Sequence, residues 1–170
     1  MPDLEPLQIT MPADRAVMHL KSWSGAPTQL SLTTSSLDGE PRLLNLGPGE
    51  WLAVSEILPT PKFKDTLDRH LKDDSIAVTD ISNGLKVLRV EGLQTRDLLA
   101  RACCLDLHPE YFPVGRCART RLAQLSVLVH CFDSKPRFDL YVGRSYLGYL
   151  RSWLTDAAVG LTDLPTAQVL

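Results

Sequence analysis

The chain has 170 residues with 18 Lys and Arg against 20 Asp and Glu, which gives a net charge of −2 at pH 7, and 44% of its residues are hydrophobic. Balanced charge and ordinary apolar content exclude an intrinsically disordered protein, and a pI near 6.1 argues against a dedicated nucleic-acid binder. No run approaches the ~18–20 apolar residues that cross a bilayer, and the acidic start Met1–Glu5 lacks the order of a secretory signal. We therefore expect a cytoplasmic protein with no nucleic-acid and no membrane partner.

The chain organisation predicts an α+β fold. Residues 1–28 contain four prolines and little periodicity, which predicts an extended N-terminal arm. One pattern then recurs three times: two strand-like runs joined by a turn, followed by an amphipathic helix. Such repeated β-β-α units predict antiparallel sheets with helices packed on one side. We expect a single domain over residues 29–160, with two lobes that divide near 73–75, and a loose tail over 161–170.

The first repeat places a Gly-Pro-Gly turn at residues 47–49 between strand-like runs over 42–46 and 51–54. A helix is predicted to open at Thr60-Pro61, because threonine is a common N-cap and proline is favoured at the first helical position. Apolar residues at every fourth position predict its buried stripe, which consists of Phe63, Leu67 and Leu71.

The second repeat runs from Ile76–Ile81 through Ser82-Asn83-Gly84 to Leu85–Val90. Asn-Gly between two apolar runs is a strong hairpin signal, because a type I′ turn needs positive φ at two successive residues. We therefore predict a β-hairpin here, followed by a helix over residues 93–104.

The third repeat predicts strands over residues 117–122, 125–131 and 138–142. A helix follows that begins with Ser145 as its cap and ends before Gly160. Its predicted core face consists of Leu147, Leu150, Leu154 and Ala157. Other faces carry Tyr146, Tyr149 and Trp153, and this aromatic fringe fits either a wider core contact or a partner-binding face.

The cysteines and histidines do not form a recognisable site in the sequence. A zinc set would combine Cys103 or Cys104 with His108, Cys117 and His130, but the spacing matches no known zinc pattern. A nucleophilic pair such as Cys104 with His130 has no neighbouring feature that would activate the thiolate. We predict that these cysteines, Cys131 included, are reduced thiols, and that the chain has no metal-binding and no catalytic residue.

Three motifs that bind nucleotides or carry a catalytic serine are missing. The sequence has no Gly-x-Gly-x-x-Gly, no Gly-x-x-x-x-Gly-Lys-Ser/Thr and no Gly-x-Ser-x-Gly. We therefore predict no cofactor-binding residue in this chain.

The most distinctive charged feature is the segment 116–121, which contains Arg116, Arg119 and Arg121. On a strand, Arg119 and Arg121 lie on the same face. Residues 116–170 hold 7 basic and 4 acidic side chains, so this part of the chain is positively charged. Three interpretations stay open: a solvated strand face, a surface for an acidic partner strand, and a site for a small anionic ligand.

Several segments, taken in order, resemble one protein family. They are Asp80–Gly92 with Arg96–Ala100, Leu46–Leu52, Cys103–Pro109 with Phe112–Thr120, and Asp139–Tyr146. Together they are similar to the aminomethyltransferase superfamily of folate-binding fold, and within it to the gamma subunits of heterotetrameric sarcosine oxidases. The resemblance covers about Leu43 to Gly160.

This resemblance implies a folate-binding-type fold and a place beside alpha, beta and delta subunits. Such complexes oxidatively demethylate sarcosine or a related N-methyl amino acid, pass the one-carbon unit to tetrahydrofolate and reduce oxygen to hydrogen peroxide. The resemblance implies NAD and a folate site in alpha, FAD and FMN in beta, zinc in delta, and no cofactor in gamma. The expected role is therefore that of a non-catalytic structural subunit. The alternatives are a small autonomous folate-binding protein or aminomethyltransferase-like enzyme, and an unrelated scaffold with the same rhythm of strands and helices.

Tryptophan and arginine supply much of the binding energy at protein interfaces when they are fully desolvated. The candidate partner-interface residues are therefore Trp51, Arg116, Arg119, Arg121 and Trp153.

Overall fold

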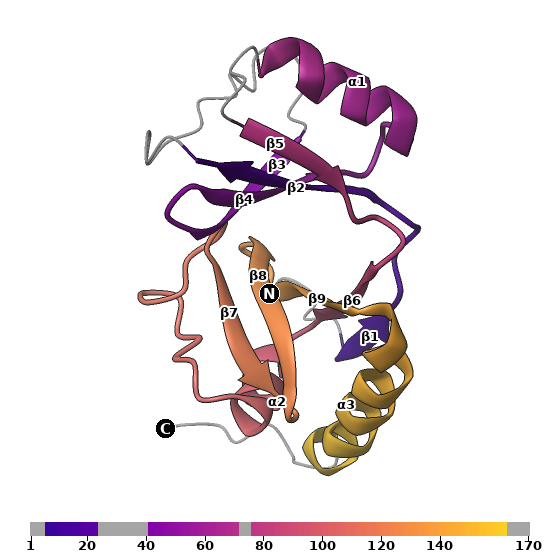
Figure 1. Cartoon of the computed structure of the whole chain (residues 1–170). Coiled ribbons are helices and arrows are strands. Elements are labelled where there is room, and N and C mark those ends of the chain that lie inside the picture. Colours follow the sequence, from indigo (N-terminus) through magenta and orange to yellow (C-terminus); the bar gives the residue numbers. More distant parts are fainter. Residues whose placement is uncertain (1–5, 24–40, 72–75, 163–170) are drawn as a thin grey trace. The chain divides into compact units, whose positions relative to one another are not determined.

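The computed structural model describes residues 6–23, 41–71 and 76–162. The chain divides into two units (Figure 1): unit 1 takes Met1–Pro12 and Lys86–Leu170, and unit 2 takes Ala13–Leu85. The division that we predicted near residues 73–75 lies outside the described residues, and the chain passes between the units at 12/13 and 85/86. None of the described helices has the length and apolar character that crossing a membrane requires.

Unit 2 is a sheet of four strands with one helix. The strand order is β3-β4-β2-β5, and each pairing is antiparallel. Met18, Leu20 and Trp51 lie on the face that packs against Phe63 and Leu67 of the helix, as the predicted stripe requires. The elements are β2 (Ala16–Ser22), β3 (Arg42–Gly47), β4 (Glu50–Ser55), α1 (Thr60–His70) and β5 (Ile76–Asp80). The N-cap of α1 is Pro59 rather than Thr60, so the predicted start is one residue late.

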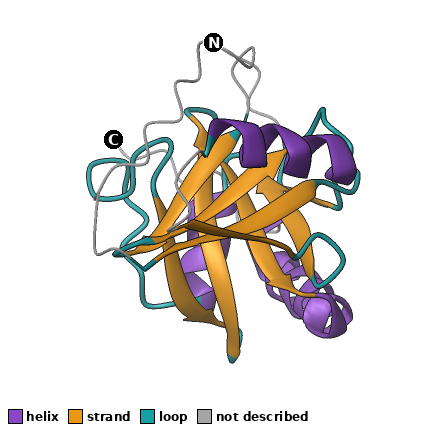
Figure 2. Ribbon diagram, turned by 45° about the horizontal axis from the view of Figure 1, so that its top comes forward, coloured by secondary structure: helices purple, strands orange, loops and turns teal. Residues whose placement is uncertain are grey.

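Unit 1 is a sheet of five strands in the order β1-β6-β9-β8-β7. Its helices cover one face of the sheet (Figure 2). The alternating residues Phe138, Leu140 and Val142 are buried in the core together with residues of the helices, as predicted. The strands are β1 (Gln8–Thr10), β6 (Leu85–Glu91), β7 (Cys117–Leu122), β8 (Leu125–Asp133) and β9 (Arg137–Gly143). The helices are α2 (Thr95–Ala102), the short 3₁₀ helix η2 (Arg144–Tyr146) and α3 (Leu147–Thr162). Both units confirm the predicted α+β class with antiparallel strand pairs.

The prediction of an extended N-terminal arm over residues 1–28 is wrong, because this segment contains the strands β1 and β2. β1 pairs with β6 in unit 1, with Ile9 opposite Val90, and β2 lies between β4 and β5 in unit 2. The prolines that suggested an arm, Pro6 and Pro12, flank β1 and leave its backbone free to pair. This segment therefore contributes one strand to each sheet.

The hairpin predicted at Asn83-Gly84 is wrong, because β5 and β6 belong to different sheets. The amides of Gly84 and Leu85 both donate to the carbonyl of Ile81, at 3.0 and 3.1 Å. Neither Asn83 nor Gly84 is among the described residues with positive φ, so the turn is not the type I′ turn that Asn-Gly favours. This turn leads the chain from unit 2 into unit 1.

Helix α3 continues through Gly160, where we predicted its end. Leu161 is buried in the core of unit 1, and its carbonyl accepts a hydrogen bond from Nε2 of Gln94 at 2.8 Å. Nη1 of Arg101 also donates to the carbonyl of Ala157 at 3.2 Å. These contacts with the α2 region stabilise a further turn of α3 and outweigh the preference of glycine for a helix end.

Candidate interaction surface

Arg119 and Arg121 lie on β7, an edge strand of the sheet of unit 1, which pairs only with β8 in the part of the chain that the structure describes. Arg119 is opposite Leu128 and Arg121 is opposite Ser126. Because Val127 belongs to the helix-covered core and side chains alternate along a strand, the two arginines point to the other face. Both side chains are exposed. The structure therefore places them on one face, as the spacing predicted.

The hairpin between β7 and β8 turns at Ala123-Gln124, with φ of 48° and 73°. Left-handed backbone costs roughly 1–2 kcal/mol for each residue that has a Cβ atom. Ala123 is buried, and its amide donates to the carbonyl of Ala102 at the end of α2 at 3.0 Å. The contact with α2 therefore holds a strained turn directly beside the arginines, and such strain is frequent at functional sites.

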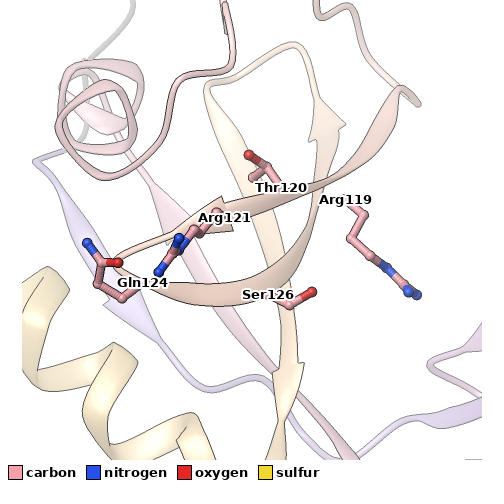
Figure 3. A pocket seen from close by; sticks show the side chains of 5 residues that line it. All are labelled: Arg119, Thr120, Arg121, Gln124 and Ser126. Atoms are coloured by element: carbon pink, nitrogen blue, oxygen red, sulfur yellow. The ribbon is translucent and has the colours of Figure 1, made fainter.

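Two hollows adjoin at this hairpin. The first, here named the β7 groove, has a volume of about 420 Å³ and is shown in Figure 3; its lining consists of Arg119, Thr120, Arg121, Gln124 and Ser126. The second, the Trp153 hollow, has a volume of about 470 Å³; its lining consists of Arg101, Ala102, Cys103, Cys104, Arg121, Ala123, Gln124 and Trp153. Because Arg121 and Gln124 line both, the two hollows form a continuous surface.

The structure thus brings together three of the five candidate interface residues: Arg119, Arg121 and Trp153. Trp153 is partly buried and packs against the core of unit 1 while it lines its hollow. Arg116 is exposed, but it lines neither hollow, and its guanidinium carbon lies 5.9 Å from the ring centroid of Phe112. Gln124 was not predicted, although the two strand predictions left only two residues for the connection.

Trp51 requires a correction. It lies in unit 2 with only 3% of its surface exposed, and it packs beside Leu20 against α1. An interface residue must offer surface to a partner, whereas the indole of Trp51 is used in the core of its own unit. Trp51 is therefore a core residue in this structure.

The charge of the β7 edge is not balanced locally. In the same sheet, Arg89 pairs with Asp139, and Arg137 pairs with Glu91 and with Asp133. Within residues 6–23, 41–71 and 76–162, Arg119 and Arg121 form no ion pair. Carboxylates from another molecule would therefore meet guanidinium groups whose charge is not yet compensated.

The cysteines and histidines are dispersed. Among the described residues, no three His, Cys, Asp or Glu side chains form a group that could hold a metal ion. Cys104 is exposed after α2, whereas His130 is buried on β8 opposite Asp139. Burial raises the pKa of the Cys103 thiol and that of the Cys131 thiol. A raised pKa lowers the fraction of nucleophilic thiolate at neutral pH.

The structure so far defines an α+β protein of two sheet-and-helix units, one of which has an arginine-rich edge. The model of a family described as "Sarcosine oxidase, gamma subunit family" matches residues 8–160. The chain belongs to the sarcosine oxidase gamma subunit family.

Individual relatives agree with this assignment. The chain is 31% identical over 145 residues to sarcosine oxidase subunit gamma of Corynebacterium sp. (strain U-96), which covers 85% of this chain and 67% of the relative. It is 29% identical over 144 residues to the protein of the same description from Corynebacterium sp. (strain P-1), covering 85% and 69%. Its structure is similar to a chain of the heterotetrameric sarcosine oxidase from Corynebacterium sp. U-96 in complex with pyrrole 2-carboxylate. That match has a TM-score of 0.78 and 26% identity, and it covers 95% of this chain and 88% of the other.

Proposed function

We propose that this chain is the gamma subunit of a heterotetrameric sarcosine oxidase, in which it supports other subunits and has no catalytic residue. The observation that carries the proposal is the family match over residues 8–160. The similarity to a chain of a heterotetrameric sarcosine oxidase, over 95% of this chain, supports the same assembly. The exposed arginines of β7 are a feature that a partner subunit could use.

The chemistry that we assign to the complex takes place in its other subunits, alpha, beta and delta. The N-methylamine unit of sarcosine, or of a related N-methyl amino acid, loses two electrons and two protons, one from the methyl carbon and one from the nitrogen, to give an imine. FAD and FMN, which we assign to beta, would carry the two electrons to oxygen, which takes up two protons as well and becomes hydrogen peroxide. The one-carbon unit passes to tetrahydrofolate in alpha, which also holds NAD, while delta holds zinc. We place this complex in the cytoplasm, a location that the four free thiols favour.

The proposal is tested by co-expression of the chain with the other subunit genes of its own source. A tag on this chain should then recover a yellow complex that consumes sarcosine and releases hydrogen peroxide. The chain expressed alone should be colourless and inactive. A flavin spectrum or oxidase activity of the isolated chain would contradict the proposal.

A titration with tetrahydrofolate distinguishes the alternative function. A structural subunit should not bind tetrahydrofolate by itself. Micromolar binding by the isolated chain would instead indicate an autonomous folate-binding protein.

A further inference from the structure

The edge of β7 offers backbone groups as well as arginine side chains. In the pairing of β7 with β8, the amide of Cys131 donates to the carbonyl of Arg116 at 2.9 Å, and the register continues without a break to the hairpin. Bonded and non-bonded pairs alternate along an antiparallel ladder, so Ala118, Thr120 and Leu122, at every second position after Arg116, direct their amides and carbonyls toward β8. The amides and carbonyls of Arg119 and Arg121 therefore point outward from the sheet.

An edge with free amides and carbonyls is a template for another strand. At this edge the outward backbone groups belong to the same two residues whose exposed guanidinium groups have no ion pair among the described residues. Backbone and side chains of Arg119 and Arg121 are thus available to the same partner, and both guanidinium groups favour a partner with negative charge.

We propose that β7 is the docking edge for an extended acidic segment of another subunit, which adds as a sixth strand to the sheet of unit 1. This inference rests on the proposed function, because it requires a complex. Residues on one face of a strand repeat at about 6.4–6.8 Å, so the segment presents carboxylates at alternate positions, acid-x-acid, to Arg119 and Arg121. Strand addition of this kind draws affinity from main-chain hydrogen bonds and specificity from the side chains.

The directions of the side chains favour an extended segment over a small anion. In Figure 3, Arg121 and Gln124 lie together at the hairpin end, whereas Arg119 points away from them. Two arginines that bind one small anion converge on it. Two separated guanidinium groups instead match two separated carboxylates on one chain.

The β7 groove also continues beyond the strand. Because Arg121 and Gln124 line the Trp153 hollow as well, a segment that runs past the turn reaches Trp153. Trp153 packs on the core of unit 1, so its truncation would disturb the fold, and it is unsuitable as a test of docking.

The arginines on the β7 edge have a second possible role, because charged residues on an edge strand prevent the sheets of two molecules from pairing. Charge reversal separates the two explanations. An edge with two glutamates is as charged as an edge with two arginines and still resists self-pairing, but it repels an acidic segment.

The test uses the co-expressed complex with the double variant Arg119→Glu/Arg121→Glu. The matched control is Arg144→Glu/Arg151→Glu, which makes the same charge change at two other exposed arginines of unit 1. The dissociation constant for the tagged partner subunits is measured at low and high salt, and circular dichroism checks the fold. We expect the edge variant to raise the dissociation constant at least about tenfold, with the control within about twofold.

Hydrogen exchange in the wild-type complex tests the strand addition itself. The amides of Ala118 and Thr120 bond to β8 and serve as the internal reference. The outward amides of Arg119 and Arg121 should be protected to a similar degree once a partner strand is present.

The outcomes are distinct. If the edge variant binds like the control, the docking edge is wrong and the proposed function stands. If the amides of Arg119 and Arg121 exchange as fast as exposed loops in the complex, no strand is added and the inference is overturned. If the wild-type chain recovers no partner subunit, the proposed function fails and the docking edge with it.

Discussion

The guanidinium of Arg89 on β6 donates two hydrogen bonds to the carboxylate of Asp139 on β9. Nε lies 2.8 Å from Oδ1, and Nη2 lies 3.0 Å from Oδ2. The side chain of Asp139 is fully buried, and that of Arg89 is 15% exposed. The guanidinium carbon of Arg89 also lies 4.2 Å from the ring centroid of Phe132 on β8, so this arginine links β6 to β9 through a salt bridge and to β8 through a cation–π contact.

Removal of one member of this pair should destabilise the chain strongly. Asp139→Asn leaves the largely buried guanidinium of Arg89 without its counter-charge, and loss of one partner of a fully buried pair costs about 3–5 kcal/mol, so the loss here should lie toward the lower end of that range. The measurement is the free energy of unfolding in urea. The double variant Arg89→Met/Asp139→Leu removes both charges, and its free energy of unfolding should fall clearly less than that of Asp139→Asn. A double variant as unstable as Asp139→Asn would contradict this account.

Gly92→Ala should disrupt the packing of the backbone that leads into β1. Gly92 has φ of +112°, and an added Cβ would lie 2.5 Å from the carbonyl oxygen of Pro6 and 2.8 Å from its carbonyl carbon. We expect a loss of about 1–3 kcal/mol or more in the free energy of unfolding, since strained backbone of this kind costs that much before the clash is counted. The matched control is Gly148→Ala on α3, where an added Cβ meets open space. This control should be neutral or stabilising by up to about 1 kcal/mol.

Gln124→Gly should stabilise the chain. Gln124 is exposed and has φ of 73°, which glycine adopts without strain. Relief of a left-handed residue corresponds to roughly 1 kcal/mol, offset in part by the greater freedom of glycine in the unfolded chain. The midpoint of thermal unfolding should therefore rise. A lower midpoint would mean that the side chain of Gln124 makes a contact worth more than the strain.

Asp80 should make the stability of unit 2 depend on pH in the acid range. The carboxylate of Asp80 accepts hydrogen bonds from the hydroxyl of Ser82 at 2.6 Å and from its amide at 2.9 Å, and these bonds lower the pKa of Asp80 below its ordinary value of 3.8. A lowered pKa in the folded state gives stability that is complete above pH 3.8 and is lost as the pH falls through the folded-state pKa.

The comparison for this prediction is Asp80→Asn, which keeps the size but does not titrate. The wild-type chain should be more stable than the variant at pH 6, and the difference should shrink below about pH 4. Ser82→Ala should raise the pKa of Asp80, as NMR titration of its carboxyl group can measure. An Asp80 pKa that is the same with and without the Ser82 hydroxyl would contradict the assigned cause.

The four cysteines should react at different rates. Cys104 is exposed, whereas Cys131 is fully buried with a raised pKa. Iodoacetamide at neutral pH should therefore modify Cys104 first and Cys131 only after unfolding. Mass spectrometry of tryptic peptides over time gives the order. Modification of Cys131 in the folded chain at the rate of Cys104 would contradict the buried position.

The sequence predicted local elements well, because hydrophobic periodicity is a local property. Most strands and all three α-helices lie within a few residues of their predicted positions. Strand partners depend on contacts between residues that are distant in the sequence, and local signals predicted one of these pairings wrongly. Asn83-Gly84 is the better type I′ hairpin sequence, yet it connects strands of different sheets, whereas the hairpin of β7 and β8 turns at Ala123-Gln124, where both residues have positive φ.

The sequence predicted only the part of the candidate surface that depends on local pattern. The alternation of Arg119 and Arg121 on a strand is visible in the sequence, and the structure places both on one face. That Trp153 and Arg101 lie near them depends on how α2 and α3 pack, which no local pattern encodes. Trp51 shows the converse, because its residue type suggests an interface while its strand position buries it.

The passage of the chain from unit 1 into unit 2 and back sets an order for folding during synthesis. The described elements of unit 2 all precede Lys86 in the chain, so this unit can fold while translation continues. β1 is synthesised before unit 2 but pairs with β6, and the sheet and helices of unit 1 are complete only once β9 and α3 are synthesised. At ~5–20 residues per second, these remaining residues take roughly 4–15 s. A nascent chain arrested in this interval should carry a protease-resistant unit 2 behind an N-terminal strand that proteases still cleave.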